Sequence, residues 1–170
     1  PIGDVARTMA RLAATGLKLA VTTSDDRAPT LRTLADLQVA ALVEVVVAGD
    51  DGISPKPAPD PLLLAADRLG VAIGNTLYVG DSIVDVEAAR AAGVAAMVAV
   101  GRPDGPAGQR ADGVIESIEE IESGGAAVDK LHVFRHGIPF LEGLDRMDAD
   151  AFILHKDIAE PHDRNGLSCH

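Results

Sequence analysis

Short apolar segments and helical patterns alternate along residues 1–122, and no other feature restricts the fold as strongly. The apolar segments lie at residues 18–23, 43–48, 76–79 and 94–100, the helical patterns lie at 4–14, 29–37, 60–69 and 82–92, and a short strand with a helix follows at 113–121. Apolar strands separated by helices are typical of a parallel sheet that is buried on both faces. We therefore expect an α/β fold, a Rossmann-like parallel sheet with helices on both faces, whose ligands bind at the carboxyl ends of the strands.

The composition changes at the run Ser123, Gly124 and Gly125. All five histidines, all three phenylalanines and the one cysteine follow this run, and none precedes it. A Ser-Gly-Gly run is typical of a linker. We therefore predict that residues 1–122 form the core and that residues 123–170 form a linker and a tail, whose fold the pattern leaves open.

The charge and the cysteine content restrict the partners and the compartment. The chain has 170 residues and a formal net charge of −11, which disfavours nucleic acids and anionic membranes because both present phosphates. With only Cys169, no intrachain disulfide is possible. The longest apolar runs are much shorter than the roughly 18 residues of a membrane span, and no leader precedes them. We expect a cytoplasmic protein that acts on a small molecule.

Thr23 and Ser24 stand where the first predicted strand ends. A hydroxyl group and backbone N–H groups near the start of a helix can bind a phosphoryl oxygen. The alternative is that both residues only cap the following helix.

Lys56 stands between prolines in the segment SPKPAPDP, directly before a predicted helix. Prolines restrict the backbone, which suits a cation that must point at a developing negative charge. The alternative is an ordinary surface lysine in a proline-rich loop.

Asp81 follows a predicted strand and Gly80, and Asp85 lies one helical turn further on the same face. Two neighbouring carboxylates repel each other unless a cation lies between them, and Mg²⁺ prefers such oxygen ligands. The alternative is a pair of acids that is stabilised by the dipole at a helix N-terminus.

The segments VTTS, KPAP and GDSIVD resemble, in this order, the second, third and fourth motifs of haloacid dehalogenase superfamily phosphatases. GDSIVD followed by EAARAAGV is the most specific part, and the best match is to the branch of phosphoglycolate phosphatase and β-phosphoglucomutase. The resemblance implies that Thr23 and the Ser24 amide bind the transferred phosphoryl group, and that Lys56 neutralises its charge. It implies that Asp81 binds Mg²⁺ and that Asp85 anchors Lys56 or a metal-bound water, so that Thr23, Lys56 and Asp85 are catalytic candidates and both aspartates are metal-site candidates.

The resembled family also has a first strand that ends in two aspartates, one of which is the nucleophile. No Asp-x-Asp-Gly-Thr sequence occurs here, and Asp148 and Asp150 lack both the preceding apolar strand and the following Gly-Thr. The family's cap would also lie before Pro1. We therefore expect a fragment of a Mg²⁺-dependent, phosphoglycolate phosphatase-like enzyme that acts on a small phosphorylated metabolite and is inactive alone. A phosphomutase of the same branch and a non-enzymatic pseudo-phosphatase or interaction module are the alternatives.

The tail contains two weaker patterns. The Arg-His-Gly sequence at 135–137 resembles the motif of histidine phosphatases, but the match covers only a few residues. The residues His155, His162, Cys169 and His170 lack the spacing of a standard zinc site.

In the resembled fold, the missing first strand lies between the strands that here end near Thr23 and Gly80, which implies that the predicted sheet is incomplete at this position. Buried backbone groups without a partner cost roughly 1–3 kcal/mol each. We predict that the gap is closed by direct pairing, by another chain or by the tail, whose apolar strand candidates are residues 131–134 and 151–154.

Overall fold

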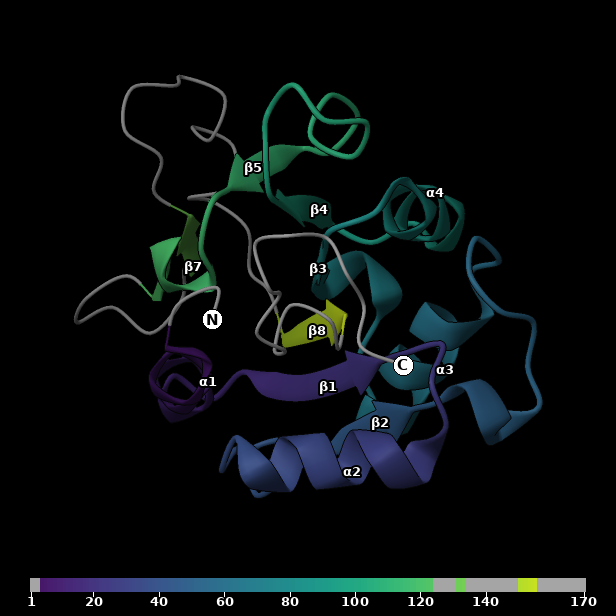
Figure 1. Ribbon diagram of the computed structural model, residues 1–170, viewed down its shortest axis with the longest axis vertical. Coiled ribbons are helices and arrows are strands. Elements are labelled where there is room, and N and C mark those ends of the chain that lie inside the picture. The colour runs from purple at the N-terminus through teal and green to yellow at the C-terminus, as the bar shows by residue number, and fades with distance from the viewer. Residues whose placement is uncertain (1–3, 124–130, 134–149, 156–170) are drawn as a thin grey trace.

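The structure is a computed structural model that describes residues 4–123, 131–133 and 150–155 (Figure 1). Its helices are α1 (Val5–Ala14), α2 (Arg27–Asp36), α3 (Asp60–Leu69) and α4 (Ile83–Ala92), with the 3₁₀ turns η1 (Gly49–Asp51), η2 (Ile73–Asn75) and η3 (Ile118–Glu120). Its strands are β1 (Lys18–Thr22), β2 (Val45–Val47), β3 (Thr76–Gly80), β4 (Ala96–Val100), β5 (Gly113–Ile115), β6 (Ile121–Ser123), β7 (Leu131–Val133) and β8 (Ala151–His155).

Six of these strands form one parallel sheet in the order β2-β1-β8-β3-β4-β5. This sheet confirms the predicted α/β fold. Two elements are shorter than the sequence pattern predicts: β2 covers only Val45–Val47 of the expected 43–48, and the helix expected within 113–121 is only the 3₁₀ turn η3. Helix α2 begins at Arg27, ahead of the predicted start at 29, because Pro29 is tolerated in the first turn of a helix.

Strand β8 fills the position between β1 and β3. It pairs in parallel with Lys18–Thr22 on one side and with Thr76–Val79 on the other. The prediction of a filled gap is therefore confirmed, and the second tail candidate is the one that fills it. The first candidate lies elsewhere, because β7 pairs antiparallel with β6 in a separate two-stranded sheet.

The side chains of β8 alternate between two apolar layers, so that the strand is buried on both faces. Phe152 and Leu154 pack in the layer that includes residues of α1 and α2, whereas Ala151 and Ile153 pack in the layer that includes residues of α3 and α4. None of these four side chains is more than 4% exposed. A continuous apolar run with this burial is typical of a central strand in a parallel sheet.

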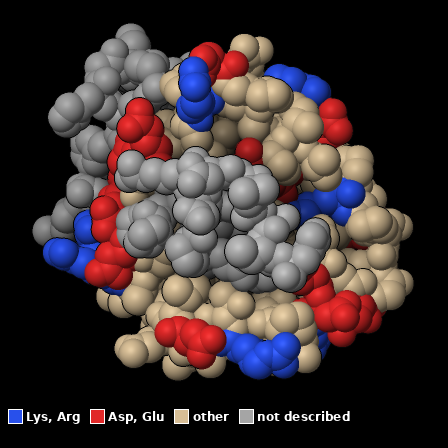
Figure 2. Space-filling view, viewed as in Figure 1, with Lys and Arg blue, Asp and Glu red and all other residues tan. Residues whose placement is uncertain are grey.

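The division into a core of residues 1–122 and a linker and tail of residues 123–170 stays a prediction. Within the predicted tail, the five residues of β8 belong to the core sheet. Within the described residues, no helix has the length and apolar character that crossing a membrane requires. On the described part of the face in Figure 2, basic side chains are interspersed with acidic ones, and over the whole chain the acids outnumber the bases by 26 to 15.

Candidate functional site

A cavity of about 260 Å³ lies at the carboxyl ends of β1, β8 and β3. It is lined by Thr23, Ser24, Asp25, Lys56, Asp81, Ser82, Val84 and His155. A second cavity of about 130 Å³ shares Thr23, Ser24 and Lys56 with the first. The fold thus brings four of the five predicted site residues to one cavity, at the sheet edge where parallel sheets bind ligands.

The fifth predicted residue, Asp85, is fully buried and holds Lys56 in place. The Nζ atom of Lys56 lies 2.7 Å from Oδ1 of Asp85, and the lysine side chain is only 4% exposed. Tyr78 completes this cluster, since its hydroxyl donates to the same Oδ1 at 2.7 Å and accepts from Lys56 at 3.2 Å. Lys56 is therefore buried and is not an ordinary surface lysine in a proline-rich loop.

The other oxygen of Asp85 is held by the first turn of α4. Oδ2 accepts the hydroxyl of Ser82 at 2.6 Å and the backbone N–H groups of Ser82 and Asp81 at 3.2 and 3.3 Å. Ser82 in turn accepts from the N–H of Asp85, which completes a capping box. Gly80 is required next to it, because a Cβ atom there would lie 2.6 Å from Cβ of Asp85.

The surroundings of Asp85 keep its carboxyl group ionised. Burial by itself raises the pKa of Asp85, but the electrostatic interactions with His155 and Lys56, with the hydrogen bonds from Lys56 and Ser82, outweigh burial and hold that pKa well below its ordinary value. Burial and the nearby charge of Asp85 raise the pKa of Tyr78 well above its ordinary value. Tyr78 therefore stays a neutral donor to Asp85.

Thr23 and Ser24 form the turn that follows β1. The hydroxyl of Thr23 accepts the N–H of Asp25 at 3.0 Å, and the N–H of Thr23 donates to the carbonyl of Val47 at 3.0 Å. Neither residue caps α2, whose N-cap is Asp26. Gly49 packs against the Ser24 carbonyl too closely for any Cβ atom, so that this turn is held from the β2 side.

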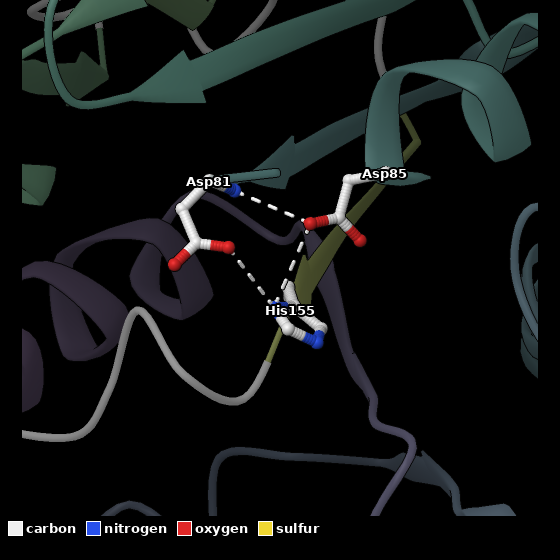
Figure 3. Close-up of side chains that lie close together, drawn as sticks. All are labelled: Asp81, Asp85 and His155. Carbon is white, nitrogen blue, oxygen red and sulfur yellow. Dashed lines mark hydrogen bonds and ion pairs between the residues drawn. The ribbon is translucent and has the colours of Figure 1, made fainter. Parts of the chain in front are cut away.

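His155 is the site residue that sequence reasoning missed. Its Nδ1 lies 3.5 Å from Oδ1 of Asp81 and 3.7 Å from Oδ2 of Asp85, and its side chain is 9% exposed (Figure 3). The sequence pattern grouped it with His162, Cys169 and His170, which lie outside the described residues, as do residues 135–137. The strand candidate at 151–154, which ends directly before it, was the feature that could have placed it here.

Asp81, Asp85 and His155 are close enough to be tested as a metal site, because their ligand atoms lie within 4.8 Å of one another. Mg²⁺ prefers oxygen ligands, and an imidazole is a poor ligand for it. The oxygens of Asp85 already accept hydrogen bonds from Lys56, Tyr78 and Ser82. Asp81 lines the cavity and its side chain is 27% exposed, so that it is the carboxylate better suited to meet a cation there.

Comparison with known sequences identifies the family of this chain. The model of the family described as haloacid dehalogenase-like hydrolase matches residues 1–99. Over 89 residues the chain is 45% identical to the phosphoglycolate phosphatase of Escherichia coli strain K12, and this segment is 52% of the chain and 35% of that enzyme. The phosphoglycolate phosphatase of Salmonella typhi is 44% identical over 89 residues, with the same coverage.

Comparison with solved structures shows the same core. A haloacid dehalogenase-type phosphatase of Thermococcus onnurineus is 32% identical with a TM-score of 0.62, over 69% of this chain and 54% of that one. A predicted phosphoglycolate phosphatase of Haemophilus somnus is 26% identical with a TM-score of 0.63, over 69% and 53%. A β-phosphoglucomutase of Clostridium difficile, 18% identical with a TM-score of 0.61 over 68% and 50%, shares the fold. The matched part spans about half of each of these structures and about a third of the curated relatives.

Proposed function

The chain belongs to the haloacid dehalogenase-like hydrolase family, and on that basis we propose that its sheet-edge cavity binds the phosphoryl group of a small phosphomonoester together with Mg²⁺. One observation carries this proposal: the buried ammonium group of Lys56, fixed by Asp85, lines the same cavity as Thr23 and Ser24. A fixed cation beside hydroxyl groups and N–H groups is the arrangement that stabilises a transferring phosphoryl group.

Each predicted residue has a separate role in this proposal. Thr23 and the Ser24 amide bind phosphoryl oxygens, and Lys56 neutralises their charge. Asp81 would hold Mg²⁺, which when bound supplies further positive charge to the phosphoryl group. Asp85 would orient Lys56 or anchor a metal-bound water, since its own oxygens already accept hydrogen bonds.

The burial of Lys56 increases its effect on a bound anion. Charges interact more strongly where water is excluded, and a preorganised charge needs no rearrangement when the reaction proceeds. The hydrogen bonds to Asp85 and Tyr78 hold the lysine in one direction.

Turnover is the step for which the described residues supply no nucleophilic aspartate on the central strand. Among the described residues, the central strand β8 ends in His155, and no aspartate stands at its carboxyl end. Without an aspartate nucleophile no phosphoaspartyl intermediate forms. We therefore propose a phosphoglycolate phosphatase-like, cytoplasmic protein that binds a small phosphorylated metabolite and hydrolyses it poorly. A non-enzymatic pseudo-phosphatase shares the binding step and differs only in turnover.

The test is hydrolysis of para-nitrophenyl phosphate with Mg²⁺. We expect turnover far below that of a complete phosphatase of the family, and equal for the parent chain and for the exposed control Glu87→Gln on α4. Robust turnover that survives both Asp81→Ala and Lys56→Ala would refute the assigned site. Turnover that only His136→Ala abolishes would favour a histidine phosphatase instead.

A further inference from the structure

We propose that His155 accepts a phosphoryl group from an activated donor of the acyl phosphate class. This inference rests on the proposed phosphoryl binding in the cavity, and it adds an acceptor that is carried by the tail strand. The product is a phosphohistidine on the protein rather than a hydrolysed ester.

The position of His155 supports this role. It ends β8, opposite Thr22 of β1, and it lines the cavity together with Thr23 and Lys56. His155 itself pairs with Thr22 of β1, and the residue before it also pairs with Val79 of β3, so that the end of the strand that carries the imidazole is held in place. A phosphoryl group bound at Thr23 and Lys56 would therefore lie next to a fixed imidazole ring.

The two carboxylates near His155 favour one tautomer of its neutral form. Oxygens of Asp81 and Asp85 lie 3.5 and 3.7 Å from Nδ1. A lone pair at Nδ1 would face these negative charges, whereas a hydrogen atom there is attracted to them. The lone pair of the neutral ring is thus at Nε2, which Figure 3 shows on the side of the ring away from both carboxylates.

A role of His155 as a third metal ligand is less well supported. It would require Nδ1 as the ligand atom, together with an oxygen of Asp85. Both oxygens of Asp85 already accept short hydrogen bonds, at 2.7 Å from Lys56 and at 2.6 Å from Ser82. Binding a metal at Oδ2, the Asp85 oxygen nearest to His155, would displace the hydrogen bonds from Ser82 that fix this carboxylate, and a buried polar group without a partner is costly.

The proposed step balances without a further reagent. The Nε2 lone pair attacks phosphorus, the bond from phosphorus to the bridging acyl oxygen breaks, and the carboxylate leaves with the bonding electrons. The hydrogen on Nδ1 stays in place, and Asp81 neutralises the positive charge of the phosphorylated ring. A simple ester would instead release an alkoxide that needs a proton, so that an acyl phosphate is the better donor.

The experiment uses acetyl phosphate with the 170-residue chain in a mildly alkaline buffer, where phosphohistidine is stable. Intact-mass spectrometry is expected to show one added phosphoryl group that is lost in acid, and peptide mapping is expected to place it on His155. His155→Asn should abolish the label, whereas His136→Asn and Glu87→Gln should retain it. Because mapping uses the parent chain, the test does not depend on the folding of a variant.

The outcomes separate this inference from the proposed function when binding of inorganic phosphate is measured in parallel. A label on another histidine, or no label despite phosphate binding, would refute the role of His155 and leave the phosphoryl site standing. If the chain is not labelled and also does not bind phosphate, both the role of His155 and the proposed phosphoryl site are refuted.

Discussion

A chain that ends at Asp150 is expected to lose the cooperative thermal unfolding transition of the 170-residue chain. Strand β8 pairs with β1 and with β3, so that its removal leaves two strands facing an empty position in the centre of the sheet. Each buried backbone group that loses its partner costs roughly 1–3 kcal/mol. Several such groups exceed the roughly 5–15 kcal/mol of stability that is typical of a domain.

A matched pair of substitutions provides the control for this prediction. Ile153→Asp places a charge at a fully buried position of β8 and should also prevent folding, whereas Leu63→Asp places the same charge at a position of α3 that is 42% exposed. The second change should shift stability by about 0.5 kcal/mol or less. Circular dichroism and calorimetry measure the folding and the stability of both variants. A truncated chain that still unfolds cooperatively at an unchanged temperature would show that β8 does not complete the sheet.

His155→Asp is expected to create Mg²⁺-dependent hydrolysis of para-nitrophenyl phosphate. The substitution places a carboxylate at the end of the central strand, in the cavity that Thr23, Lys56 and Asp81 line. A carboxylate can serve as a nucleophile for phosphoryl transfer, and para-nitrophenolate leaves without needing a proton. The new negative charge lies near Asp81 and Asp85, so that turnover should require the metal and should stop when a chelator is added.

The His155→Asp variant also allows the role of Lys56 to be tested. Lys56→Ala, combined with His155→Asp, should lower kcat roughly 10²- to 10³-fold, as loss of one preorganised partner of a developing charge usually does. Circular dichroism must show that both variants are folded, because Asp85 would lose its buried partner. A folded His155→Asp variant with no more turnover than the parent chain would contradict the assignment of this cavity as a phosphoryl-transfer site.

The order of the core elements was predictable because each is encoded locally. Pro61 in the first turn and Gly70 at the C-cap give α3 the bounds that the sequence predicts. The pattern overestimated the length of β2, whose paired part is Val45–Val47. Apolar character extends beyond the pairing there, and pairing depends on the neighbouring strand rather than on the segment itself.

Four of the cavity residues before the linker were also predictable, because each stands at a strand end or near a helix start that the sequence marks: Thr23, Ser24, Lys56 and Asp81. Two parts of the site, Tyr78 and His155, could not be predicted from the sequence. Tyr78 resembles an ordinary strand residue, and only the fold places its hydroxyl between Lys56 and Asp85. His155 reaches the cavity through a pairing of β8 with strands that are distant in the sequence, and the choice among tail segments depends on register and burial that local patterns do not encode.

The central claim is that this sheet edge binds a phosphoryl group with the help of a metal, and calorimetric titration with inorganic phosphate tests it most directly. We expect phosphate to bind in the presence of Mg²⁺ and to bind at least about tenfold more weakly without Mg²⁺ or in Asp81→Asn, since losing an attraction between opposite charges of only about 1.4 kcal/mol already weakens binding tenfold. The exposed control Glu87→Gln should bind as the parent chain does. No binding of phosphate, or binding that neither Mg²⁺ nor Asp81→Asn affects, would contradict the claim.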